Sequence, residues 1–383
     1  MRPIFVSLLC ALCLMGGALP SSAQTEGDPA VDFDSLLEEI GNSSDIVGLA
    51  VAVVRDGEVE SMRTFGVRSL DGLEPIDEET VFRLASVSKG IASSVVGQMV
   101  SEERISLSAP ASSFSETLQL KNSHDLTRLT LEDVLSHRSG LPPYAYDNLL
   151  EAGISPAIIR GRYAEVDPIC AVGACYTYQN VVFDTVTELI ESVDGKAFSE
   201  ALNTRLFEPL GMTRASASLD GLQRDDNWAR PYQRKRGGPW QQVEIKDAYY
   251  AIPAAGGANA SISDMAIWLR AQMGYHEEVL AKDVLAMIHA PRVTTRAELR
   301  RLRNGFPGLE AASYGLGWRI YDFAGDRVIS HFGSVDYGFG AQITFIPSKD
   351  VGIVVLTNSR SKGYSKIVPA FLERELAANV SSR

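Results

Sequence analysis

Five apolar, β-branched runs lie near the two ends of the 383-residue chain, and their placement constrains the fold more than any other feature. They cover residues 49–54, 59–67, 328–332, 341–346 and 351–356. Asp56-Gly57 separates the first two runs, which is a β-hairpin signal, and the last three predict an antiparallel meander. We therefore expect one sheet that is assembled from both ends of the chain.

The stretch between these runs is predicted to be mostly helical. Helix-start signals lie at Thr130, Ser155 and Ser261, and apolar residues recur with helical spacing after each of them. A last amphipathic helix is expected over residues 365–378. Strands at both ends with helices between them predict one α+β domain over residues 30–379, with a helical subdomain inserted into the sheet.

The first 23 residues have the composition of a secretory signal peptide. Arg2 is followed by an apolar run over residues 4–14, and small residues lie at Ser21 and Ala23. The run is too short to span a bilayer. We expect cleavage after Ala23 and a periplasmic or secreted mature chain without a membrane span; the alternative is an uncleaved N-terminal anchor.

Charge and cysteine content agree with an exported chain. The formal net charge is −12, which argues against electrostatic binding to nucleic acid or anionic lipid. Cys10 and Cys13 lie inside the predicted signal peptide and should leave with it. Cys170 and Cys175 remain, in a compartment that permits disulfides. We expect them to form either a disulfide that closes a small loop or two buried free thiols.

Ser86 and Lys89 lie three residues apart at the start of a predicted helix, so they share one helix face. A partly desolvated lysine has a lowered pKa and could take up or relay the proton of a nucleophilic serine. The helix carries a single apolar stripe, formed by Ile91, Ala92, Val95, Val96, Met99 and Val100. Residues 359–362 repeat the spacing, but they follow a predicted strand in a polar stretch and are interpreted as a turn.

Two later stretches carry further groups suited to acyl transfer. Tyr178 could move protons, and Asn180 could hold a substrate amide or carbonyl at the start of a predicted helix. In residues 331–334, Gly333 lets a substrate approach the backbone closely, and the N–H of Ser334 could help to form an oxyanion hole. Each group alone also has a purely structural interpretation, as a helix-start residue or a β-bulge.

Together and in this order, these stretches resemble the serine β-lactamase and penicillin-recognising family, in particular its class C branch and the related esterases and D-amino-acid peptidases. The likeness begins near residue 49 and includes residues 82–89, 135–142, 207–212, 314–318 and 353–358. It implies a β-lactamase/DD-peptidase-like fold, an antiparallel sheet flanked by helices. In that fold the active site lies in the groove between the sheet and the helical subdomain.

By this likeness Ser86 is the nucleophile, and Lys89 and Tyr178 share the general acid/base work. Asn180 contacts the substrate, and the backbone N–H groups of Ser86 and Ser334 form the oxyanion hole. The resemblance implies no metal and no organic cofactor.

The third motif departs from the family pattern. His331, Phe332 and Gly333 occupy the place where many β-lactamases and penicillin-binding proteins carry Lys-Thr-Gly, so a titratable imidazole replaces a fixed cation. By this likeness His331 and Gly333 contact the substrate, and we expect His331 to offer it a partial charge near neutral pH. His137 lies in a structural turn of the family and is not assigned as a base. We expect an ester or amide hydrolase with a small-molecule or peptidoglycan-like acyl substrate, and poor turnover of carboxylate-bearing β-lactams. The alternatives are a true β-lactamase, a D-alanyl-D-alanine carboxypeptidase, or a non-catalytic protein that binds peptidoglycan fragments.

Overall fold

The computed structural model describes residues 32–380, except residues 236–237, 304–305, 307, 324 and 336–337, and it describes side chains as far as residue 376. The predicted signal peptide lies outside the described residues, so the predictions of cleavage and export stay predictions. Among the described residues, no helix is both long enough and apolar enough to cross a membrane.

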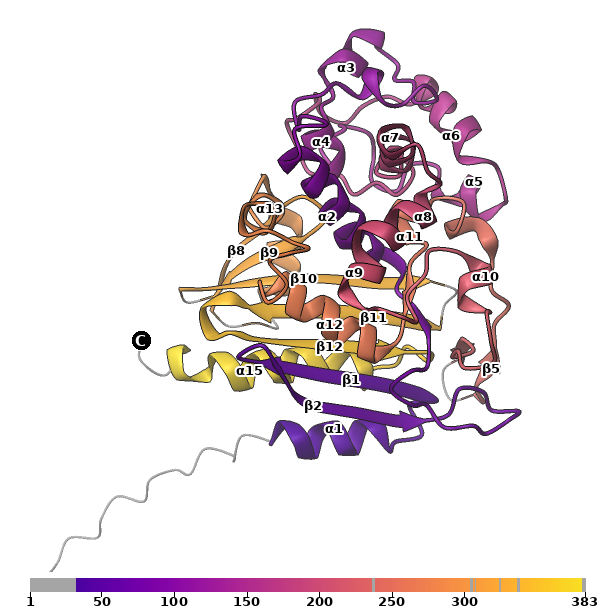
Figure 1. Ribbon diagram of the computed structural model, residues 1–383, viewed down its shortest axis with the longest axis vertical. Helices are drawn as coiled ribbons and strands as arrows, with labels where there is room; N and C mark the ends of the chain where they lie inside the picture. The colour runs from indigo at the N-terminus through magenta and orange to yellow at the C-terminus, as the bar shows by residue number, and fades with distance from the viewer. Residues whose placement is uncertain are drawn as a thin grey trace, which may run out of the picture. The chain divides into compact units, whose positions relative to one another are not determined.

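A mainly antiparallel sheet lies at the centre of the domain (Figure 1). Within the described residues it has eight strands in the order β2-β1-β12-β11-β10-β9-β8-β7, and every neighbouring pair is antiparallel. The strands are β1 (Gly48–Arg55), β2 (Glu58–Gly66), β7 (Val293–Thr294), β8 (Leu309–Tyr314), β9 (Arg319–Phe323), β10 (Asp326–Val335), β11 (Phe339–Ile346) and β12 (Val351–Thr357). The predicted hairpin and meander are both confirmed, and β12 joins them by pairing with β1 and β11.

Helices cover both faces of this sheet, and most of them lie between β2 and β7 in the chain. The helices are α1 (Phe33–Gly41), α2 (Ser88–Ser101), α3 (Ser123–Arg128), α4 (Leu131–Leu135), α5 (Asp147–Glu151), α6 (Pro156–Arg162), α7 (Thr185–Asp194), α8 (Phe198–Leu202), α9 (Glu208–Leu210), α10 (Leu219–Leu222), α11 (Pro253–Gly256), α12 (Ile262–Gln272), α13 (Lys282–Ile288), α14 (Arg296–Leu302) and α15 (Tyr364–Val380). Two short strand pairs lie outside this sheet: β3 (Phe82–Arg83) with β6 (Asn259–Ala260), and β4 (Tyr232–Gln233) with β5 (Gln241–Gln242).

The two-residue period of β1 explains why the sheet is buried on both faces. Leu49, Val51 and Val53 pack in a core with α1 and α15, which lie on one side of the sheet in Figure 1. The alternate residues, Ala50 and Ala52 among them, belong to the larger core shared with α2 and α12. The prediction of a sheet flanked by helices, with a helical subdomain inserted, is therefore confirmed.

Most predicted helix starts are also confirmed. Thr130 and Ser261 each begin a capping box in which the side chain accepts from a backbone N–H three residues on. The single apolar stripe predicted for the helix after Ser86 is wrong, because α2 is buried on nearly every side. It runs between the sheet and the helical subdomain, so even Ser93 and Ser94 are inside the protein.

Candidate active site

Ser86 lies in a tight turn directly before α2, within the 3₁₀ helix Ala85–Val87. Ala85 has a φ of +47°, in the left-handed region that costs a residue with a side chain about 1–2 kcal/mol. Ser88 holds this turn, since its Oγ donates to the Ala85 carbonyl at 2.6 Å and accepts from the Ala258 N–H at 2.9 Å. The sequence predicted Ser86 at a helix start. It did not indicate the strained backbone, because a positive φ is usually signalled by a glycine and residue 85 is an alanine.

Lys89 is the second residue of α2, one turn after Ser86, and three polar groups surround its amine. Its Nζ is 3.4 Å from Ser86 Oγ, and it donates to Asn180 Oδ1 and to the Ala255 carbonyl, both at 2.8 Å. The side chain is fully buried, and desolvation lowers the pKa of Lys89 to about 7 against the opposing charges of Asp147 and Asp184. A neutral amine has two N–H groups for the two carbonyl acceptors, which leaves its lone pair for the hydroxyl of Ser86.

Tyr178 is the other group bonded to Ser86 through its side chain. The ring is buried, and desolvation raises the pKa of Tyr178 to about 12, although the charge of Arg319 opposes the rise. Near neutral pH the phenol therefore keeps its proton. This arrangement favours Lys89 as the group that removes a proton from Ser86, and Tyr178 as a donor or relay.

Asn180 connects Lys89 to the helical subdomain. Its Oδ1 accepts from Lys89, and its Nδ2 donates to Asp147 Oδ2 at 2.7 Å. The prediction that residues 178–180 open a helix is wrong, because α7 begins only at Thr185. They lie in a loop, and its Asn180 side chain orients the lysine amine.

Gly333 brings the end of β10 against the turn that carries Ser86. A Cβ atom added there would lie 2.3 Å from the Leu84 carbonyl oxygen and 2.7 Å from the Ser86 nitrogen. β9 pairs with β10 only as far as Ser330, so the last residues of β10 are free on that edge. Ser334 follows Gly333 and lines the same cavity as Ser86, which places both residues of the predicted oxyanion hole beside one space.

His331 does not line that cavity. It is fully buried; Nδ1 lies 3.1 Å from the Phe332 carbonyl and Nε2 lies 2.9 Å from Tyr314 Oη. A ring that donates from Nδ1 and accepts at Nε2 is neutral, and burial holds the pKa of His331 well below its ordinary value. The expectation that His331 offers a partial charge to the substrate is therefore wrong, because alternation along β10 turns its side chain into the protein.

Arg319 supplies the cation that sequence reasoning looked for at His331. It begins β9, lines the cavity, and its Nη1 is 2.5 Å from Glu298 Oε1. Its guanidinium carbon lies 4.5 Å from the centroid of the Phe332 ring and 5.6 Å from that of Tyr178. In the sequence, Arg319 could have been noticed because it directly follows residues 314–318, which resemble the family. That its side chain reaches the cavity follows only from the pairing of β9 with β10.

The cavity that contains Ser86 has a volume of about 390 Å³. The residues that matter for chemistry there are Ser86, Tyr178, Asn180, Arg319, Phe332 and Ser334. A second cavity, of about 460 Å³, lies between the strands and α15 and does not include Ser86. Within the described residues, no three His, Cys, Asp or Glu side chains are arranged to hold a metal ion.

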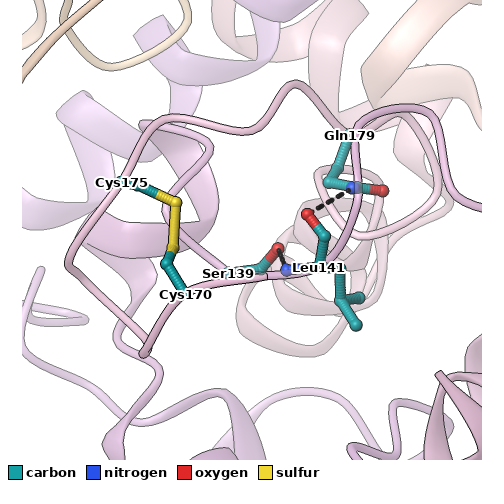
Figure 2. The surroundings of a disulfide bond; sticks show 5 residues. All are labelled: Ser139, Leu141, Cys170, Cys175 and Gln179. Carbon is teal, nitrogen blue, oxygen red and sulfur yellow. Dashed lines mark hydrogen bonds between the residues drawn. A yellow bond between two sulfur atoms is a disulfide. The ribbon is translucent and has the colours of Figure 1, made fainter. Parts of the chain in front are cut away.

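A disulfide lies just ahead of Tyr178 (Figure 2). Cys170 and Cys175 are bonded, and the loop between them is held to the preceding turn, since the Gly173 N–H donates to the Arg138 carbonyl at 2.8 Å. The Ile169 and Thr177 N–H groups, on either side of the loop, also donate to that turn, to the carbonyls of Gly140 and His137. The disulfide loop is thus held on both sides, and Tyr178 directly follows the second of these fixed points, Thr177.

His137 is a packing partner of Tyr178. Its Nδ1 accepts from the Gln179 N–H at 3.2 Å, and its ring centroid lies 4.2 Å from that of Tyr178. Burial holds the pKa of His137 well below its ordinary value, so the ring is neutral. These contacts agree with a structural role for His137.

Comparison with known proteins adds independent findings. A profile of the Beta-lactamase family matches residues 33–377. The chain is 26% identical over 352 residues to an unguisins hydrolase of Aspergillus campestris (strain IBT 28561), covering 88% of this chain and 64% of that protein. The chain therefore spans less than two thirds of the length of that relative.

Two bacterial relatives match over nearly their whole length. A beta-lactamase of Escherichia coli (strain K12) is 24% identical over 404 residues, covering 96% of this chain and 98% of the relative. The D-alanyl-D-alanine-carboxypeptidase/endopeptidase AmpH of the same organism is 24% identical over 371 residues, covering 93% and 91%.

Among solved structures, an octameric penicillin-binding protein homologue from Pyrococcus abyssi matches with a TM-score of 0.77. It is 23% identical and the match covers 90% of this chain and 77% of that one, so it bears on the fold alone. The family profile spans nearly all of the described residues and the known fold agrees with the observed sheet and helices. The chain therefore belongs to the Beta-lactamase family of serine hydrolases.

Proposed function

We propose that this protein is an exported serine hydrolase that cleaves ester or amide bonds through an acyl-enzyme on Ser86. The observation that carries the proposal is the environment of the Ser86 hydroxyl, which is bonded to Tyr178 and faces a buried lysine amine with a pKa of about 7. A base with a pKa near the working pH combines the right protonation state with useful proton affinity. Its substrate is a small-molecule or peptidoglycan-like acyl compound.

In this proposal neutral Lys89 takes the proton of Ser86 as Oγ attacks the substrate carbonyl carbon. The carbonyl oxygen becomes an oxyanion that accepts from the backbone N–H groups of Ser86 and Ser334. The proton then passes from Lys89, through Tyr178, to the leaving alcohol or amine as its bond to the carbonyl carbon breaks. Water repeats the sequence on the acyl-enzyme, which releases the acid and restores Ser86.

A fluorophosphonate probe followed by peptide mass spectrometry tests the nucleophile. We expect one adduct on Ser86 in the folded protein, no adduct in Ser86→Ala, and turnover of p-nitrophenyl acetate only by the wild type. Ser359, which begins the repeated spacing at residues 359–362, should stay unlabelled. Absence of the Ser86 adduct in folded protein would instead support a non-catalytic binding protein.

Arg319 favours a second candidate function, hydrolysis of carboxylate-bearing substrates such as a β-lactam or a D-alanyl peptide. A permanent guanidinium on the cavity wall can bind a carboxylate, and two relatives are named a beta-lactamase and a D-alanyl-D-alanine-carboxypeptidase/endopeptidase. The test compares a chromogenic cephalosporin with p-nitrophenyl acetate. Arg319→Gln is combined with Glu298→Gln, so that no buried carboxylate is left unpaired.

If Arg319 holds the carboxylate, the ratio of kcat/KM for the cephalosporin to that for the ester should fall at least tenfold in the double variant. An unchanged ratio, or no cephalosporin turnover by the wild type, would reject this second function. Export is tested separately by N-terminal sequencing of the mature protein from its native host, which should begin after Ala23.

A further inference from the structure

One wall of the catalytic cavity is acidic. Asp147 and Glu151 are the first and last residues of α5, and both line the same cavity as Ser86. Residues four apart lie on one helix face, so the two carboxylates belong to one surface. This wall comes from the helical subdomain, whereas Arg319 enters the cavity from β9 of the sheet.

The two carboxylates have acceptor capacity that the protein does not use. Asp147 Oδ2 accepts from Asn180, but Asp147 Oδ1 is buried and has no hydrogen-bond partner among the described residues. Glu151 Oε1 accepts from Tyr249 Oη at 3.1 Å. An ionised carboxylate has about four lone-pair sites, so a donor with several N–H groups can be shared between these two side chains.

Among the described residues neither carboxylate is in an ion pair, although the charge of Lys89 acts on Asp147 and Lys246 lines a neighbouring cavity with Glu151. Arg319 is the one basic residue among the described residues that line the cavity, and Glu298 already pairs with it. The amine of Lys89 is directed to Ser86, Asn180 and Ala255 rather than to Asp147. The wall therefore presents two carboxyl groups without an ion-pair partner beside the nucleophile, although burial raises the pKa of Asp147 against the opposing Asn180 hydrogen bond and Lys89 charge.

We propose, on the basis of the serine hydrolase proposed above, that Asp147 and Glu151 bind a protonated amine of the substrate. The enzyme then selects acyl compounds that carry a free ammonium group close to the scissile carbonyl, such as amino-acid amides and esters or peptides with a free N-terminus. An ammonium group has a positive charge and three N–H donors that two carboxylates lining one cavity can share, whereas a neutral N-acyl group has one N–H and no charge.

Asp147 also has a simpler role, because it orients the Asn180 amide that in turn holds Lys89. That positioning role alone would affect substrates with and without an ammonium group equally. Glu151 separates the two possibilities, since its side-chain bond is to Tyr249 and not to the catalytic groups.

The experiment measures binding rather than turnover. The p-nitroanilides of D- and L-alanine, each with a free or an N-acetylated amine, are titrated calorimetrically into the full chain carrying Ser86→Ala. At pH 7 the α-amino group, with an ordinary pKa of about 7.7–8.0, is mostly protonated. Glu151→Gln and Asp147→Asn are each added to Ser86→Ala, and Glu165→Gln, whose exposed carboxylate pairs with Arg162 outside the cavity, is the matched control.

We expect the free amine of at least one enantiomer to bind about 10-fold tighter than its N-acetyl form, which corresponds to about 1.4 kcal/mol. Glu151→Gln and Asp147→Asn should each reduce that preference at least threefold, and Glu165→Gln should leave it unchanged. Equal or tighter binding of the N-acetyl forms, or a preference that survives in Glu151→Gln, overturns the inference. Failure of the hydrolase proposal would appear elsewhere, as an absent fluorophosphonate adduct on Ser86 in the wild type.

Discussion

Replacing Gly333 by alanine is the sharpest test of how the strand positions the nucleophile. The added Cβ would lie 2.3 Å from the Leu84 carbonyl oxygen and 2.7 Å from the Ser86 nitrogen. Both obstacles are backbone atoms of the strained turn, so no side-chain rotation can relieve them. Either β10 or the turn at Ala85 must move.

The required displacement sets the expected effect. Contacts of Cβ atoms below 3.0 Å are essentially never seen, so the two backbones must separate by about 0.7 Å. Misplacing reacting groups by 1 Å can cost about 10²-fold in rate, and loss of one oxyanion donor costs about 10²–10³-fold. We therefore expect kcat of Gly333→Ala to fall by about 10²-fold, with a loss of about 1–3 kcal/mol in the free energy of unfolding from overpacking.

The assay pairs p-nitrophenyl acetate turnover and the rate of fluorophosphonate labelling with thermal unfolding. Gly352→Ala in β12 is the control, because its Cβ would meet Leu269 Cδ1 and Phe345 Cβ at 2.8 Å in the core and not the turn at Ser86. It should lose stability and keep its kcat. A Gly333→Ala protein that keeps kcat within threefold of the wild type would refute the argument that Gly333 positions the oxyanion hole.

Three further predictions concern the proton path and the loop ahead of Tyr178. If neutral Lys89 is the base, kcat/KM for a neutral ester should rise with pH through an apparent pKa of about 7, and activity should be lost below it. A flat profile between pH 5.5 and 8.5 would contradict this role. Tyr178→Phe should lower kcat by about 10²–10⁴-fold while circular dichroism shows a retained fold, and near-normal turnover would remove Tyr178 from the proton path. Thiol titration of denatured, unreduced mature protein should find no free thiol, whereas two would mean that Cys170 and Cys175 are not bonded.

The strands and helices that sequence reasoning located are those with strong local signals. Residues 49–54 and 351–356 are apolar at consecutive positions because β1 and β12 are buried on both faces. β8 and β9 were not predicted. The first, over residues 309–314, is rich in alanine and polar residues, and it is buried only at Leu309, Ala312 and Tyr314, which is not a two-residue period. Pairing with β10 and β7, rather than local propensity, makes these segments strands.

The spacing of Ser86 and Lys89 predicted their proximity correctly, because one helical turn fixes it. Their environment was not predictable from spacing. The left-handed backbone at Ala85, the burial that depresses the pKa of Lys89, and the arrival of Asp147 and Glu151 from α5 all depend on contacts between segments far apart in the chain. Tertiary structure, and not a motif, sets the charge of this site.

The position of Arg319, the cation of the cavity, shows most clearly that tertiary contacts set the charge of the site. The third motif by itself indicates a protein that lacks the lysine of many relatives and therefore binds a substrate carboxylate weakly. In the structure a guanidinium from β9 lies at the cavity instead, held in place by Glu298, while the imidazole on β10 is neutral and turned inward. Because a guanidinium stays protonated near neutral pH, the cavity keeps a positive group there. Whether the cavity can bind a substrate carboxylate must therefore be judged from Arg319. The identity of residue 331 does not indicate it.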